Sequence, residues 1–173
     1  MKVLIAGLGK LGSTVAYTLM LKLPVEKLIL YDIKDLSGDI MDLENASFFN
    51  NIEVTTKVES VDYLIICAGT PRKNKDDDLY EANKKVFLDI YENLSDILDE
   101  KTTVIIMTNP VERITELARR TIPEDVKVVN PEEILLKMRK GKELGWDIVK
   151  TKGYSNFGPA MSVCKLIEDL EKQ

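Results

Sequence analysis

Short apolar runs alternate along the chain with segments whose apolar residues recur at helical spacing. The runs are KVLIA (2–6), KLILYD (27–32), IEVTT (52–56), VDYLIICA (61–68), TTVIIMT (102–108) and VKVV (126–129). Their strand-like length and their richness in Val, Ile and Leu predict strands that are buried on both faces. Since helical segments separate them, we predict an α/β fold with a doubly wound parallel sheet of about six strands.

The intervening segments predict helices at 12–23, 37–49 and 79–98, and a further helix that begins with Pro110 at its first position. The helix at 79–98 places Val86, Ile90, Leu94 and Ile97 on one face. Beyond the sixth run, Asn130 is the expected N-cap of another helix, and the C-terminal segment NFGPAMSVCKLIEDLEK predicts the last one.

Composition limits the function classes. The 173 residues are 45% hydrophobic and 31% charged, with a net charge of −5, which argues against nucleic acid as a partner. The apolar runs are too short to span a membrane, and the first run begins at once without a signal peptide, so we expect a cytoplasmic protein. Cys67 and Cys164 lie in apolar segments and are interpreted as buried small hydrophobes. The chain contains no histidine, which excludes histidine-based catalysis and histidine metal sites, and no metal is expected.

The segment GLGKLG follows the first run directly and opens a helix. Gly7, Gly9 and Gly12 form a G-x-G-x-x-G pattern, and the amides near Lys10 and Leu11 are expected to face a pyrophosphate. Asp32 ends the second run about 20 residues after the third glycine, where a carboxylate accepts the ribose hydroxyls of NAD and repels the extra phosphate of NADP. The sequence therefore predicts a Rossmann-type domain that binds NAD.

Seven segments occur in an order that resembles the lactate/malate dehydrogenase family, and TNPV and KGYSNFGPA are the most specific among them. They are GLGKLGSTVAY, LILYDI, GDIMDLENA, IICAGTPRK, DLYEAN, MTNPVERIT and KGYSNFGPA. The resemblance implies that Ala68 and Gly69 border the cofactor and that Asn109 lies near the nicotinamide or substrate. Asn109 also fits a plain helix-entry residue before a proline. It further implies a dinucleotide-binding Rossmann domain at 1–129, with 130–173 as extra C-terminal helices, the remnant of a substrate domain packed on the first as one compact unit.

Family chemistry also implies a histidine that exchanges the substrate proton, an aspartate that orients it, and arginines that bind the substrate. In the family these lie mainly between the sixth strand and the helix before KGYSNFGPA, a segment that this sequence lacks. The lid that follows PRK is short, and Asp76 occupies the position of the family's lid arginine. Arg72 matches the malate-type specificity arginine, although we favour its interpretation as a solvent-facing residue of a polar loop. The three aspartates 76–78 are expected to be a solvated loop and helix start, and no catalytic residue is assigned.

The resemblance implies a homodimer that forms through helices 37–49 and 153–171, unless both helices only cover their own sheet. We interpret the chain as an NAD(H)-binding pseudoenzyme with a binding or regulatory role. One alternative is an NAD-dependent oxidoreductase of 2-hydroxy acids that takes its acid from Lys75, Tyr154 or a partner chain. The other is a dimeric scaffold with a relic cofactor site.

Overall fold

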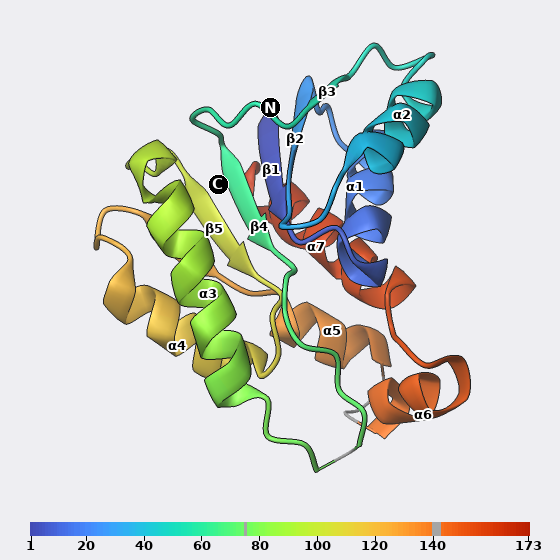
Figure 1. Cartoon of the computed structure of the whole chain (residues 1–173), viewed down its shortest axis with the longest axis vertical. Coiled ribbons are helices and arrows are strands. Elements are labelled where there is room, and N and C mark those ends of the chain that lie inside the picture. The colour runs from blue at the N-terminus through green and yellow to red at the C-terminus, as the bar shows by residue number, and fades with distance from the viewer. Residues whose placement is uncertain (75, 140–142) are drawn as a thin grey trace.

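The computed structural model describes residues 1–74, 76–139 and 143–173. Six parallel strands form one sheet in the order β3-β2-β1-β4-β5-β6, as the apolar runs predicted (Figure 1). The strands are β1 (Lys2–Ala6), β2 (Lys27–Tyr31), β3 (Glu53–Thr55), β4 (Tyr63–Ile66), β5 (Thr103–Ile106) and β6 (Lys127–Val129). This order reverses direction between β1 and β4, the point at which doubly wound sheets bind their ligands.

Helices cover both faces of the sheet, and the fifth and sixth along the chain lie beyond the carboxyl ends of its strands (Figure 1). They are α1 (Lys10–Lys22), α2 (Ser37–Ala46), α3 (Tyr80–Leu94), α4 (Val111–Thr121), α5 (Glu132–Arg139), α6 (Glu143–Lys152) and α7 (Phe157–Leu170), with a 3₁₀ turn, η1 (Ser95–Ile97), after α3. Helices α1, α2 and α7 contribute to the core on one face, while α3 and α4 pack on the other (Figure 1). Among the described residues, no helix is both long and apolar enough to cross a membrane.

The side chains of β1 alternate between the two faces of the sheet and so contribute to the core on both. Val3 and Ile5 face the layer of α1 and α7, whereas Leu4 and Ala6 face the layer of α3 and α4, and all four are fully buried. Period-two alternation in a strand buried on both faces produces this division.

The apolar face predicted for residues 79–98 is confirmed in part, since Ile90 and Leu94 are buried while Val86 and Ile97 are partly buried and pack against the same core. The buried stripe of α3 consists of Asn83, Phe87, Ile90 and Leu94, and Val86 is only partly buried. The inward stripe therefore begins at a polar residue, which a hydrophobic pattern does not include.

Several helix ends also differ from their predicted positions. The helix expected at 37–49 ends at Ala46, and a turn follows in which Asn51 has a φ of 53°. The segment expected at 153–171 begins as a helix only at Phe157, while Gly153, with a φ of 88°, follows the end of α6 and donates to the carbonyl of Val149. Pro110 is the N-cap of α4 instead of its first residue. Helix α6 was not predicted.

Candidate cofactor-binding site

A cavity of about 750 Å³ lies at the carboxyl ends of the strands. The glycine loop after β1 lines one side, and the loops that follow β4 and β5 line another. Helices α5 and α6 lie beyond this edge of the sheet (Figure 1), and Leu135, Trp146 and Val149 close the cavity from there. Its volume is in the range of sites for small molecules and cofactors.

The glycines of GLGKLG have two different roles. Gly7 has a φ of 99°, and a Cβ there would lie 2.3 Å from the backbone nitrogen of Ala68. A Cβ on Gly12 would lie 1.8 Å from the carbonyl oxygen of Gly7, so α1 packs against the loop only with glycine at this position. Around Gly9, by contrast, no atom of the described residues beyond its own chain neighbours lies within 4 Å of a Cβ position. Gly9 lines the cavity and leaves room for a ligand to approach the backbone.

The amino end of α1 points its first amides at this space. Its N-cap is Gly9, so among the described residues no side chain caps the helix. The first N–H groups of a helix lack intrahelical partners and, together with the helix dipole, favour an anion. The Lys10 ammonium adds positive charge here and lies 5.5 Å from the centre of the Tyr154 ring, while Lys152 lies 4.6 Å from the same ring.

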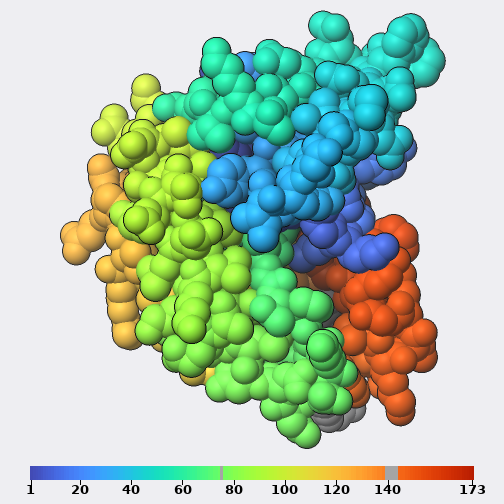
Figure 2. Space-filling view, viewed as in Figure 1, coloured from blue at the N-terminus to red at the C-terminus, as the bar shows by residue number. Residues whose placement is uncertain are grey.

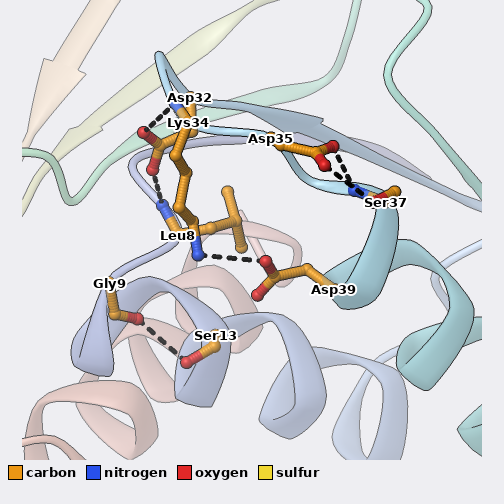
Figure 3. Close-up of polar contacts among 8 residues, drawn as sticks. All are labelled: Leu8, Gly9, Ser13, Asp32, Lys34, Asp35, Ser37 and Asp39. Atoms are coloured by element: carbon orange, nitrogen blue, oxygen red, sulfur yellow. Dashed lines mark hydrogen bonds and ion pairs between the residues drawn. The ribbon is translucent and has the colours of Figure 1, made fainter.

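Asp32 follows β2 and holds the glycine loop (Figure 3). Its Oδ2 accepts a hydrogen bond of 2.6 Å from the backbone N–H of Leu8, and its Oδ1 accepts one of 3.2 Å from the backbone N–H of Lys34. Each carboxylate oxygen can accept a further bond, so Asp32 retains the capacity to bind a ribose hydroxyl.

Asn83 joins the two loops that follow β4 and β5. Its Oδ1 accepts the backbone N–H of Thr70 at 2.6 Å, and its Nδ2 donates to the carbonyl of Asn109 at 2.5 Å. A Cβ on Gly69 would lie 3.0 Å from Cγ2 of Thr108 and 3.2 Å from Oδ1 of Asn83, so these loops pack tightly. The positions of Gly69 and Asn109 at the cavity therefore depend on one buried amide.

The aspartates after PRKN are more structured than a solvated loop. The Asp77 carboxylate accepts the backbone N–H groups of Lys73 and Asn74 at 2.9 and 2.7 Å, and these bonds lower the pKa of Asp77. Asp78 accepts the backbone N–H of Tyr80 at 3.0 Å and forms an ion pair of 3.1 Å with Arg113 of α4.

The Arg113 guanidinium also lies 3.9 Å from the centre of the Tyr80 ring. The start of α3 is thus tied to α4. The third aspartate, Asp76, and the exposed Arg72 line the cavity. Lys75, a suggested alternative acid, lies outside the described residues.

The cavity brings together most of the residues that the sequence singled out. Its lining includes Gly9, Lys10, Leu11, Gly12, Gly69, Arg72 and Asn109. Gly7, Asp32 and Ala68 do not line it, since Gly7 packs beneath the loop on Ala68 and Asp32 lies behind Leu8. Sequence reasoning missed Asn83, although it falls within the quoted DLYEAN motif, and it missed Trp146 because α6 was not expected.

The two cysteines differ from each other. Cys164 is buried in the core, as predicted, whereas Cys67 is partly exposed and borders the cavity. Burial raises the pKa of the Cys67 thiol to about 12 and that of Cys164 to about 11, so both are neutral thiols near pH 7. No group of three side chains that could hold a metal occurs within residues 1–74, 76–139 and 143–173.

Solved structures of two kinds of dehydrogenase share this fold. The malate dehydrogenase from Archaeoglobus fulgidus in complex with NADH superimposes with a TM-score of 0.82 at 21% identity, over 99% of this chain and 78% of that one. The L-lactate dehydrogenase from Clostridium thermocellum gives a TM-score of 0.77 at 19% identity, over 96% of this chain and 75% of that one.

Curated relatives match over the N-terminal part. The L-lactate dehydrogenase of Acetivibrio thermocellus is 32% identical over 123 residues, which are 66% of this chain and 38% of that protein. The L-lactate dehydrogenase 1 of Staphylococcus aureus strain JH9 is 30% identical over 123 residues, or 64% and 38% of the two chains. The chain thus spans 38% of the length of these relatives.

The family model for the NAD-binding domain of lactate/malate dehydrogenases matches residues 1–129. This range contains the whole sheet, the glycine loop and Asp32, so NAD is the cofactor of the domain. The chain therefore belongs to the lactate/malate dehydrogenase family.

Proposed function

We propose that this chain binds NAD(H) at the cavity and does not carry out the family's hydride transfer by itself. One observation carries the binding half of the proposal, namely that a single cavity runs from the glycine loop to Asn109. The open space over Gly9 and the uncapped amides of α1 suit the pyrophosphate. Asp32 does not line the cavity but bonds the glycine loop at Leu8, next to it, where it suits the adenosine ribose. The nicotinamide would then lie toward Gly69 and Asn109, where NAD supplies its hydride chemistry when bound.

The residues around the other end of the cavity support the second part of the proposal, that the chain does not carry out hydride transfer by itself. The family's proton transfer relies on a histidine, and the chain has none. Between β6 and α5 there are only Asn130 and Pro131, where the family carries its catalytic segment. The pKa of the Cys67 thiol is about 12, so the thiol stays protonated near neutral pH and does not serve as the base. Since general acid–base catalysis contributes about 10²–10⁴-fold, its loss leaves little turnover.

Charge at the substrate end also disfavours a carboxylate substrate. Asp76 lines the cavity together with Arg72, so a carboxylate beside the arginine would also meet an acid. Like charges at close range raise the cost of binding an anion. A binding or regulatory role therefore fits the site better than turnover of a 2-hydroxy acid.

Calorimetric titration with NAD and NADH tests the binding half. We expect NADH to bind the wild-type chain and Asp32→Ala to weaken it by about tenfold or more. Glu92→Ala, on the exposed side of α3, is the control and should leave the affinity unchanged. The absence of binding at millimolar cofactor would refute the proposal.

A hydride-transfer assay tests the other half. The purified chain is mixed with NAD and malate or lactate, or with NADH and oxaloacetate, and absorbance at the nicotinamide band is followed. We expect no change above the protein-free rate. Malate-dependent NADH formation by the chain alone would show that another group supplies the proton transfer, with Tyr154 at the cavity the first to replace.

We further propose a homodimer that uses the outer side of α2, the turn after it, and α7. Large apolar side chains are exposed there, namely Met41, Phe48, Phe49, Phe157 and Met161. Figure 2 shows α2 and the turn after it on the upper right of the molecule, where nothing from the chain covers them. Light scattering should give twice the monomer mass, and Phe48→Ser with Phe49→Ser should give a monomer. Met138→Ser, an exposed residue of α5, is the control, and a wild-type monomer at micromolar concentration would contradict the dimer.

A further inference from the structure

A second acidic residue lies beside the adenosine end of the proposed site. The Nζ of Lys34 forms an ion pair of 3.0 Å with Oδ2 of Asp39, in the first turn of α2. The backbone N–H of Lys34 bonds Asp32, which in turn bonds Leu8. Figure 3 shows the Lys34 side chain extending from beside Asp32, past Leu8, to Asp39. Three separate segments, after β1, after β2 and at the start of α2, thus meet around one lysine.

The lysine is the cation of a cluster that is otherwise acidic. Asp35 completes the cluster, and its carboxylate accepts the backbone N–H and the hydroxyl of Ser37 at 2.9 and 3.0 Å. In the part of the chain that the structure describes, the Asp35 carboxylate bonds Ser37, and the Lys34 ammonium pairs with Asp39 instead of with Asp35. The four charged groups shown in Figure 3 are therefore three carboxylates and one ammonium.

The Lys34 ammonium is paired with Asp39 but remains accessible to solvent. The Lys34 side chain is 47% exposed and that of Asp39 is 25% exposed. An exposed ion pair of this kind contributes little to folding stability. Its position matters more, because a cation next to the ribose-binding acid is what a dinucleotide site needs to accept the 2′-phosphate of NADP.

We propose that Asp39 is a second determinant of cofactor choice, which binds the Lys34 ammonium and so withholds it from a 2′-phosphate. The proposal rests on the proposed NAD(H) site. Asp32 repels the phosphate directly, and Asp39 removes the one nearby charge of the cluster that would attract it. Discrimination against NADP is then divided between two carboxylates on different elements.

Titration of the full chain with NADH and with NADPH tests this division. Asp39→Asn should raise the affinity for NADPH about three- to five-fold, the size expected for one exposed charge pair, and leave NADH within about two-fold. Asp35→Asn is the matched control, because it removes the same charge from the same cluster without freeing Lys34, and it should change NADPH by less than two-fold. Adding Lys34→Met to Asp39→Asn should cancel the gain. A melting curve for each variant verifies that it is folded.

The outcomes separate this inference from the function on which it rests. Equal gains for Asp39→Asn and Asp35→Asn would overturn it in favour of a general charge effect. A gain that survives Lys34→Met would overturn it as well, because the ammonium would not be involved. If wild-type protein bound NADH but none of the variants changed NADPH affinity, the inference would fail and the proposed function would stand. If wild-type protein bound no NADH, both would fall.

Discussion

Replacing Asn83 with alanine should loosen the cavity by separating the two loops that its amide joins. Asn83 is 1% exposed, and it accepts from Thr70 and donates to Asn109 over 2.6 and 2.5 Å. Alanine removes both bonds and leaves a space beside Gly69, where a Cβ would lie 3.2 Å from Oδ1 of Asn83. Thr108, which donates to the carbonyl of Ala68 at 2.7 Å, would still join the two loops.

The expected loss follows from the two bonds. A hydrogen bond in a folded protein contributes about 0.5–1.5 kcal/mol, so the pair contributes about 2 kcal/mol. Thr70 and Asn109 are exposed residues and both bonds are only partly buried, so the full penalty for a buried unpaired group is not added. For a chain of this size a loss of about 2 kcal/mol lowers the melting temperature by about 4–8 °C.

Denaturant unfolding monitored by circular dichroism measures this loss, with Asn93→Ala as the control. Asn93 lies on the same helix, α3, but its side chain is exposed and donates only to the carbonyl of Asp89 at 2.7 Å. The control should change stability by about 0.5 kcal/mol or less. NADH affinity should fall for Asn83→Ala and not for Asn93→Ala. If the two variants unfolded at the same denaturant concentration, the amide would not be what holds these loops.

Three further predictions concern the glycines, the thiols and the acidic loop. Gly9→Ala should keep the wild-type melting temperature yet weaken NADH binding, whereas Gly12→Ala should lower the melting temperature by calorimetry, because its Cβ would lie 1.8 Å from a backbone oxygen. At pH 7.5 Cys67 and Cys164 should react with iodoacetamide much more slowly than a free thiol, as followed by mass spectrometry, since burial raises both pKa values, to about 12 and about 11. The hydrogen bonds to Asp77 lower its pKa below the ordinary value, so the loop should be ordered at neutral pH and loosen as the pH falls through that lowered pKa. Hydrogen exchange of the Lys73 and Asn74 amides would show the loss of protection, and Asp77→Asn should abolish its pH dependence.

The parts of the fold that were predicted correctly depend on regular patterns. Strands buried on both faces gave apolar runs, and their order followed from the alternation with helices. The parts that failed depend on polar or irregular contacts. The buried face of α3 was predicted only in part, because its first buried residue, Asn83, is polar. Helix α6 was missed, and with it the Trp146 side of the cavity.

The candidate site likewise contains residues that the sequence could place and contacts that it could not. Gly9 and Gly12 could be placed because a G-x-G-x-x-G turn is a requirement of local backbone geometry. The pairing of Lys34 with Asp39 could not be predicted from the sequence, since it depends on how the loop after β2 leads into α2. The role of Asp77 in holding two amides was likewise not visible in a run of three identical residues.

The contacts of this acidic loop bear on how a cofactor can bind. Asp77 closes a turn on the backbone at 73 and 74, and Asp78 ties the start of α3 to Arg113 of α4. Movement of the loop over a ligand would have to break these bonds or bend the short segment before them. The glycine loop, by contrast, is rigid, since both Gly7 and Gly12 lie against backbone atoms. Cofactor affinity in this chain should therefore depend on the preformed end of the cavity more than on closure of this loop.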